Sequence, residues 1–224
     1  MCSQRTGSQR TGSQRSRAEG FTLVELLVVI AIIAILALFT WPALHRMILK
    51  SRLHGYATQV AGLMHQARME SVKRSVPTVV RLDFDADQVV VFVDVDQDGE
   101  FTPDSTVPLG EADFELVRRQ RPETVTFAGP DDGEEGADTI NGFSARTDVS
   151  LPHQAVFNPD GSIAAPGGFR VADIKGNFLE VRVAPQATAR VELLKHDPDY
   201  TNPDDPDDHW RAQREGGEAW QWNM

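Results

Sequence analysis

The feature that most constrains this chain is a long apolar run near its N-terminus that contains a single carboxylate. Residues 26–39 carry no polar side chain, and across residues 21–44 the only ionisable group is Glu25. An α-helix rises roughly 1.5 Å per residue, so this segment is long enough to cross a hydrocarbon core of about 30 Å. Basic residues precede the run, which predicts a cytoplasmic N-terminus and export of the remainder.

Three kinds of segment share this composition. A cleaved secretory signal needs a pair of small residues after its apolar core, and residues 34–45 offer none at the required spacing. A plain signal anchor would hold an exported domain without any need for Glu25. The third kind must explain the carboxylate, because an unpaired charge inside a membrane is costly and usually marks a function.

The sequence at 20–25, GFTLVE, followed by the apolar run, resembles the processing site of type IV pilins and type II secretion pseudopilins. In these families a membrane peptidase cuts after the glycine and methylates the new N-terminal residue. The resemblance implies cleavage between Gly20 and Phe21, N-methylation of Phe21, and Glu25 as the fifth mature residue. It also implies a helix-kinking role for Pro42.

Glu25 has no basic partner within residues 21–44. The free amine of Phe21 in a neighbouring subunit would supply the opposite charge at a similar membrane depth. That pairing would fix the position of each subunit relative to its neighbour during assembly, a role that buried polar groups sometimes have. The alternative is a glutamate near the interface whose carboxylate reaches the lipid headgroups.

Helical spacing continues beyond Pro42. One apolar stripe follows it, formed by Tyr56, Val60, Leu63, Met64 and Ala67. Pro77 predicts that the helix ends near Lys73 or Arg74. A single helix from Phe21 would then be on the order of 80 Å long, and its second half needs a sheet to cover the stripe.

Strand patterns follow the helix. Residues 79–93 alternate, turn through a polar stretch and continue as a β-branched run, which predicts a hairpin. Further strands are expected at 124–127, 154–157, 168–172, 178–184 and 189–194. One long N-terminal helix packed on an antiparallel sheet is an α+β arrangement, and it is also the architecture of pilins.

Two later stretches resemble the GspH/FimT subgroup of minor pseudopilins. One is residues 63–82, with Ala67, Arg68 and Glu70 ahead of a strand, and the other is VFNPDG at 156–161. A glycine that often precedes the last strand in that subgroup is absent here. These marks divide the chain into a cleaved basic leader (1–20), a transmembrane and filament-core helix (21–44), an amphipathic continuation (45–76), a periplasmic β-rich domain (77–195) and an acidic, Trp-containing tail (196–224).

The strongest candidate for a ligand site follows the predicted hairpin. The first half of a calcium loop has Asp at positions 1, 3 and 5 and Gly at position 6, and the chain matches it with Asp94, Asp96, Asp98 and Gly99. Position 12 is Ser105 where an EF-hand has a bidentate Glu, so Asp104 or Glu111 would have to replace it. The alternative is a solvated acidic turn between strands.

The remaining patterns exclude several functions. We find no Ser–His–Asp order in a supporting context, no metal-ligand spacing among the six histidines and no glycine-rich phosphate loop, so we expect no enzyme. The net charge of −11 disfavours nucleic acid as a partner, since an acidic protein repels phosphate backbones.

We therefore expect a minor pseudopilin, a structural subunit of a type II secretion pseudopilus. It would span the bacterial inner membrane once, with its N-terminus cytoplasmic and its C-terminal domain periplasmic. Its partners would be a prepilin peptidase and methyltransferase and the other pseudopilins, with calcium as the one candidate cofactor. The alternatives are a FimT-like minor pilin of a type IV pilus, some of which take up DNA, and a calcium-binding exported domain on a plain signal anchor.

Overall fold

The computed structural model describes residues 21–102, 112–130, 139–143, 154–200, 209–212, 220 and 222. The chain divides into two compact units, Met1–Leu44 and His45–Met224. Asp104, Ser105 and Glu111 lie outside the described residues, as does Gly20. Within the described parts, no helix combines the length and the apolar content that a membrane crossing requires.

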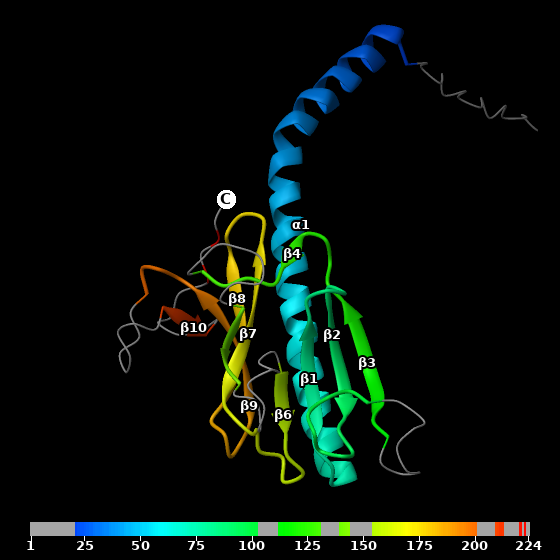
Figure 1. Cartoon of the computed structure of the whole chain (residues 1–224). Helices are drawn as coiled ribbons and strands as arrows, with labels where there is room; N and C mark the ends of the chain where they lie inside the picture. Colours follow the sequence, from blue (N-terminus) through cyan, green and yellow to red (C-terminus); the bar gives the residue numbers. More distant parts are fainter. Residues whose placement is uncertain are drawn as a thin grey trace, which may run out of the picture. The chain divides into compact units, whose positions relative to one another are not determined.

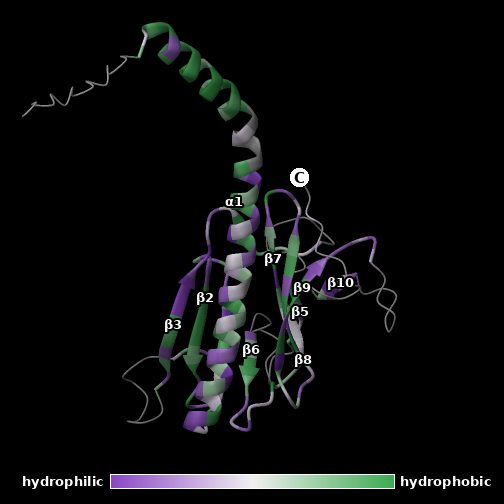
Figure 2. Cartoon of the chain, turned by 180° about the vertical axis from the view of Figure 1, so that it is seen from behind, coloured by the Kyte–Doolittle hydropathy of each residue, from purple (hydrophilic) through white to green (hydrophobic). Residues whose placement is uncertain are grey.

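The helix α1 spans Leu23–Arg74 and ends where the sequence predicts. Lys73 and Arg74 in its last turn both pair with Glu70, at 3.1 and 2.7 Å. Ser75 then adopts a left-handed conformation with φ of 59°, and the proline at position 77 cannot continue a helix. Figure 2 shows that α1 is mostly hydrophobic in its N-terminal part and mixed further along.

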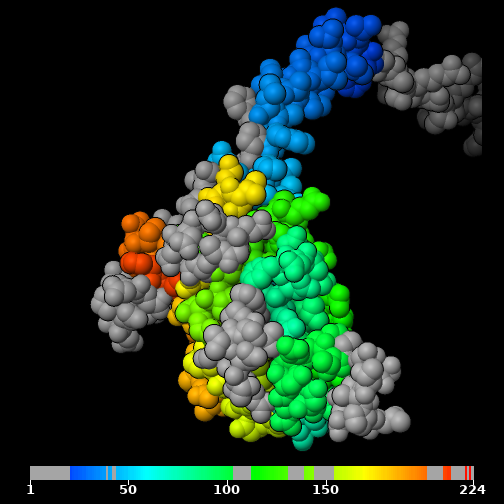
Figure 3. Space-filling model, viewed as in Figure 1, coloured from blue at the N-terminus to red at the C-terminus, as the bar shows by residue number. Residues whose placement is uncertain are grey.

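The first sheet has four antiparallel strands in the order β3-β2-β1-β6. These strands are β1 (Thr78–Asp83), β2 (Gln88–Val93), β3 (Phe114–Gln120) and β6 (Gln154–Phe157). The expected hairpin is confirmed as β1 and β2, which pair from Thr78↔Val93 to Asp83↔Gln88. In Figure 3 the largely exposed strand β3 contributes to the green surface of the second unit, whereas the residues of β2 are buried.

The second sheet is also antiparallel, in the order β10-β9-β8-β7-β4, with β5 pairing with β7. Its strands are β4 (Val125–Thr126), β5 (Ile140–Gly142), β7 (Gly167–Asp173), β8 (Phe178–Ala184), β9 (Arg190–His196) and β10 (Trp210–Ala212). The α+β class is confirmed, but the strands form two sheets where we expected one. Strands β3, β5 and β10 were not expected from the sequence.

The core of the second unit lies between α1 and the two sheets. The predicted apolar stripe of α1 is confirmed as buried at Tyr56, Val60, Leu63, Met64 and Ala67. These side chains join strand residues of both sheets, among them Val91 and Val181, in one continuous cluster. In Figures 1 and 2, which view the chain from opposite sides, this part of α1 runs along both sheets.

The C-terminal end of α1 is held against the turn that follows β6. The Arg68 Nε donates to the carbonyl of Gly161 at 2.9 Å, and the Ser71 hydroxyl shares its proton between the carbonyls of Asn158 at 3.0 Å and Arg68 at 2.8 Å. Gly161 has a φ of 81°, and a Cβ there would lie 3.1 Å from a methyl group of Val72. This turn therefore needs glycine both for its backbone conformation and for its close approach to the helix.

A buried ion cluster joins β7 to β8. Glu180 is completely buried and accepts from Arg170 at 2.8 Å and from Arg182 at 2.6 Å. Gly168 leaves room for this carboxylate, since a Cβ there would lie 2.6 Å from Glu180 Oε1. The guanidinium of Arg170 also lies 5.0 Å from the ring centroid of Trp210, which connects the cluster to β10.

Glu180→Gln is expected to lower the free energy of unfolding by about 3–5 kcal/mol, because it removes the buried carboxylate that pairs with the buried Arg170 and with the partly buried Arg182. Glu192→Gln is the matched control. Glu192 pairs with Arg190 at 2.9 Å, but those side chains are 36% and 73% exposed, and we expect no measurable loss there. Urea unfolding of the full chain in detergent micelles, followed by tryptophan fluorescence, measures both. Equal losses from the two variants would contradict this account.

Candidate functional site

The start of α1 carries the predicted processing and assembly residues. Thr22 precedes the helix, and its hydroxyl and backbone N–H both donate to Glu25 Oε2, at 2.8 and 2.9 Å. The backbone N–H of Glu25 donates in return to the Thr22 hydroxyl at 3.2 Å. This reciprocal pattern is a capping box, which satisfies N–H groups that the first helical turn leaves without partners.

The capping box gives Glu25 a partner within its own chain that our sequence analysis missed. The signal was present, because Thr-x-x-Glu ahead of an apolar run is typical of a helix N-terminus. Pairing of Glu25 with a neighbouring amine therefore stays a prediction beside this second role. The kink at Pro42 also stays a prediction, and α1 is helical on both sides of that residue.

The N-terminal segment of α1 presents its apolar side chains outward. Every residue from 21 to 38 is exposed, and Phe21, the predicted new N-terminus, is 82% exposed. Soluble proteins rarely leave continuous apolar surface of this extent open, so such a surface marks a contact with lipid or protein.

The acidic residues after β2 come together with a fourth carboxylate that the motif did not include. Asp94, Asp96, Asp98 and Asp113 each contribute an oxygen, and these four oxygens lie within 4.8 Å of one another. Asp113 immediately precedes β3, and Val93 pairs with Phe114, so Asp94 and Asp113 extend the same antiparallel ladder. The strand register places Asp113 at the site, which explains why the spacing of the first three residues did not reveal it.

Asp113 also shapes the loop. It accepts the backbone N–H of Val95 at 2.7 Å and that of Thr102 at 3.0 Å, so it ties both ends of residues 95–102 to the start of β3. Gln97 and Gly99 have φ values of 65° and 83°, which turn the chain sharply enough to bring Asp96 and Asp98 back toward Asp94.

The electrostatics of this cluster are unfavourable. Burial, the largest cause, and the neighbouring charges of Asp113 and Asp96 together raise the pKa of Asp94 to about 7. Burial also raises the pKa of Asp113, although its two backbone donors oppose the shift. Ionised Asp94 has no hydrogen-bond donor among the described residues and is 0% exposed, and a side-chain hydrogen bond with Asp96 also favours its protonated form.

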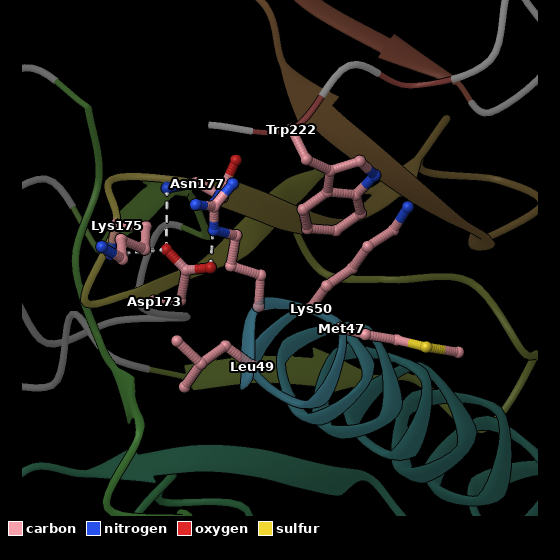
Figure 4. A pocket seen from close by; sticks show the side chains of 8 residues that line it. Met47, Leu49, Lys50, Asp173, Lys175, Asn177 and Trp222 are labelled. Atoms are coloured by element: carbon pink, nitrogen blue, oxygen red, sulfur yellow. Dashed lines mark hydrogen bonds between the residues drawn. The ribbon is translucent and has the colours of Figure 1, made fainter. Parts of the chain in front are cut away.

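A pocket of about 360 Å³ lies where α1 passes the turn between β7 and β8 (Figure 4). It is lined by Arg46, Met47, Leu49, Lys50, Asp173, Lys175, Asn177 and Trp222. Lys50 Nζ lies 4.8 Å from the ring centroid of Trp222. Asp173 accepts the backbone N–H groups of Lys175 and Asn177 and the Asn177 side-chain amide, at 2.8 to 3.0 Å. Asp173 therefore closes its own turn, and the described residues that line the pocket offer a ligand no carboxylate without a hydrogen-bond partner.

Comparisons with known proteins place these features in a family. Residues 15–41 match the model of the prokaryotic N-terminal methylation motif, and residues 56–191 match the model of type II transport protein GspH. A methylation motif followed by a long helix packed on antiparallel sheets defines a pilin-like protein. Because the second match spans more than half of the sequence, the chain belongs to the GspH family.

Solved structures with limited similarity include two proteins of this kind. The type IV minor pilin FimU of Pseudomonas aeruginosa PAO1 is 14% identical, with a TM-score of 0.39 over 64% of this chain and 89% of its own. The minor pseudopilin EpsH of the Vibrio cholerae type 2 secretion system is 10% identical, with a TM-score of 0.40 over 64% of this chain and 97% of its own. The search of curated proteins found no match.

The unsatisfied burial of Asp94 predicts a stability change in metal-free protein. Its pKa is raised from 3.8 to about 7 on folding, so ionising it costs stability progressively as pH rises through that range, and in full above it. In EDTA at pH 8, Asp94→Asn should therefore raise the free energy of unfolding by about 1–3 kcal/mol. Asp85→Asn, at an exposed turn position, should change it little.

Urea unfolding in EDTA, repeated at pH 4, checks both the sign and the origin of this effect. The advantage of the Asp94→Asn variant should shrink at pH 4, where the wild-type carboxyl is protonated in the folded state. A less stable Asp94→Asn variant at pH 8 would contradict the account.

Proposed function

We propose that this protein is a minor pseudopilin, a non-enzymatic structural subunit of a type II secretion pseudopilus that takes part in protein export. The observation that carries the proposal is the presence on one chain of an N-terminal methylation motif and a GspH domain. The function belongs to the assembled filament, to which each subunit contributes a helix for the core and a folded domain for the surface.

In this proposal the leader at 1–20 is removed between Gly20 and Phe21, and Phe21 is methylated. The segment at 21–44 then anchors the subunit in the bacterial inner membrane before assembly, with the second unit in the periplasm. The exposed apolar side chains of residues 21–38 support this role, because lipid and then the helices of neighbouring subunits would cover them.

A minor pilin of a type IV pilus would use the same processing and the same helix. DNA uptake by such a pilin requires a positive surface, and the net charge of −11 opposes it. A plain signal anchor remains the alternative from a different class, and it predicts that the leader stays attached.

Co-expression with a prepilin peptidase tests the processing step. We expect the intact mass of the membrane-extracted protein to correspond to residues 21–224 plus one methyl group. A catalytically inactive peptidase is the control and should leave the chain uncut. A chain that still begins at Met1 beside the active peptidase would overturn the proposal and leave the signal-anchor alternative.

Two substitutions at the helix start separate the two roles of Glu25. Gln can replace Glu in a capping box, so Glu25→Gln keeps the cap and removes the charge. Thr22→Val keeps the charge and removes the hydroxyl, at a cost of about 1 kcal/mol of capping energy. If the charge sets the assembly register, Glu25→Gln should abolish cross-linking to neighbouring pseudopilins, whereas Thr22→Val should preserve it.

Both variants should be cleaved normally, and intact mass verifies this before assembly is scored. The reverse result, with Thr22→Val unable to assemble and Glu25→Gln assembling normally, would show that the cap is what assembly requires.

A further inference from the structure

We propose that the loop between β2 and β3 binds one Ca²⁺ ion through the carboxylates of Asp94, Asp96, Asp98 and Asp113. This site goes beyond the filament role proposed above, and its test does not depend on processing or assembly. Four observations carry it: the mutual distances of the ligand atoms, the burial of Asp94, the hydrogen bonds of Arg81, and the arrangement of the ligands in the loop.

The distances fit a single ion. Calcium takes oxygen ligands at about 2.3–2.6 Å, so two ligands on opposite sides of the ion are roughly 5 Å apart. The four carboxylate oxygens all lie within 4.8 Å of one another, which is the spacing that one shared ion demands. Without a cation, four carboxylates so close together repel one another.

Asp94 supplies the observation that points to a ligand. Asp94 is 0% exposed and faces the other three carboxylates. As an ionised carboxylate it has no hydrogen-bond donor among the described residues, and only its protonated form can hydrogen-bond, with Asp96. Buried carboxylates are normally paired, hydrogen-bonded or bound to metal. The chain itself provides a comparison in Asp173, which is also buried but accepts three N–H donors.

Arg81 interacts through its charge with Asp98 and Asp94, but its hydrogen bonds go to other groups. Its Nη2 donates to the carbonyl of Gly99 at 2.6 Å and to Gln154 Oε1 at 3.0 Å, and its Nε donates to the same Gln154 oxygen at 3.1 Å. The guanidinium also lies 5.2 Å from the ring centroid of Phe92. Arg81 therefore holds the turn at Gly99 in place, and one such charge does not balance four carboxylates.

The number and arrangement of the carboxylates in this loop favour calcium over magnesium. Magnesium requires nearly ideal octahedral geometry at about 2.0–2.1 Å and keeps much of its water, whereas calcium accepts many carboxylates in irregular arrangements. Three ligands come from one short turn, and Asp113 enters from the neighbouring strand. Asp113 thus takes the place that a bidentate glutamate occupies at the end of an EF-hand loop.

Calorimetric titration of the full chain in detergent micelles with calcium chloride, after removal of metal with EDTA, tests the site. We expect saturable binding of one ion and a higher melting temperature in calcium than in EDTA. Sites of extracellular modules bind with dissociation constants of about 10⁻⁴–10⁻³ M, so the titration should extend to about 10 mM. Magnesium should bind at least tenfold more weakly.

Asp94→Asn should weaken calcium binding at least tenfold and remove the calcium-dependent rise in melting temperature. It should do so while remaining folded, because the substitution relieves a buried charge in the metal-free protein. Asp113→Asn should weaken binding similarly, and Asp85→Asn, which makes the same charge change at an exposed turn, should bind as the wild type does. The proposal is overturned by wild-type protein that shows no saturable binding, by an Asp94→Asn variant that binds normally, or by equal weakening in Asp85→Asn.

Discussion

The interaction on which the second unit depends is the burial of one face of α1 against two sheets. Leu53, Tyr56, Val60, Leu63 and Met64 are each at most 5% exposed, and fully burying a side chain of this size contributes about 1.5–3 kcal/mol. Each sheet has an apolar inner face that another element must cover. The helix supplies that cover to both, so the position of α1 sets the position of the strands.

The two stretches that resemble the GspH/FimT subgroup contact each other at the C-terminal end of α1. Arg68 and Ser71 lie more than eighty residues from the turn at 158–161, yet both donate to its carbonyl groups. The φ of 81° at Gly161 and its approach to Val72 explain why the turn carries a glycine. What resembles two separate motifs in the sequence is therefore one contact, which locks the last turns of α1 onto the first sheet through β6.

Elements with a periodic apolar pattern were predictable from the sequence, and strands without such a pattern were not. The end of α1, the β1–β2 hairpin, β6 and β8 follow from apolar spacing, Pro77 and the N-P-D-G turn. Strand β3 is exposed along most of its length, so it carries no alternating apolar pattern. Strand β10 lies in an acidic stretch that composition assigns to a tail, although Trp210 is buried against the second sheet. The place of Asp113 beside Asp94 was not predictable either, because it depends on strand register, which no local motif encodes.

The capping role of Glu25 and the assembly role proposed for it are compatible because they would use different atoms. Both bonds that its side chain accepts from Thr22 go to Oε2, which leaves Oε1 open to a second donor among the residues described. In lipid, the first N–H groups of a helix have no water to bond with, so a cap is worth more there than at a solvated helix end. A capped carboxylate is also fixed in direction, since the capping bonds restrict its rotamers. Capping would therefore hold Oε1 in one direction. A fixed oxygen would pair more easily with the amine of a neighbouring subunit, so the capping box would favour the proposed contact between subunits.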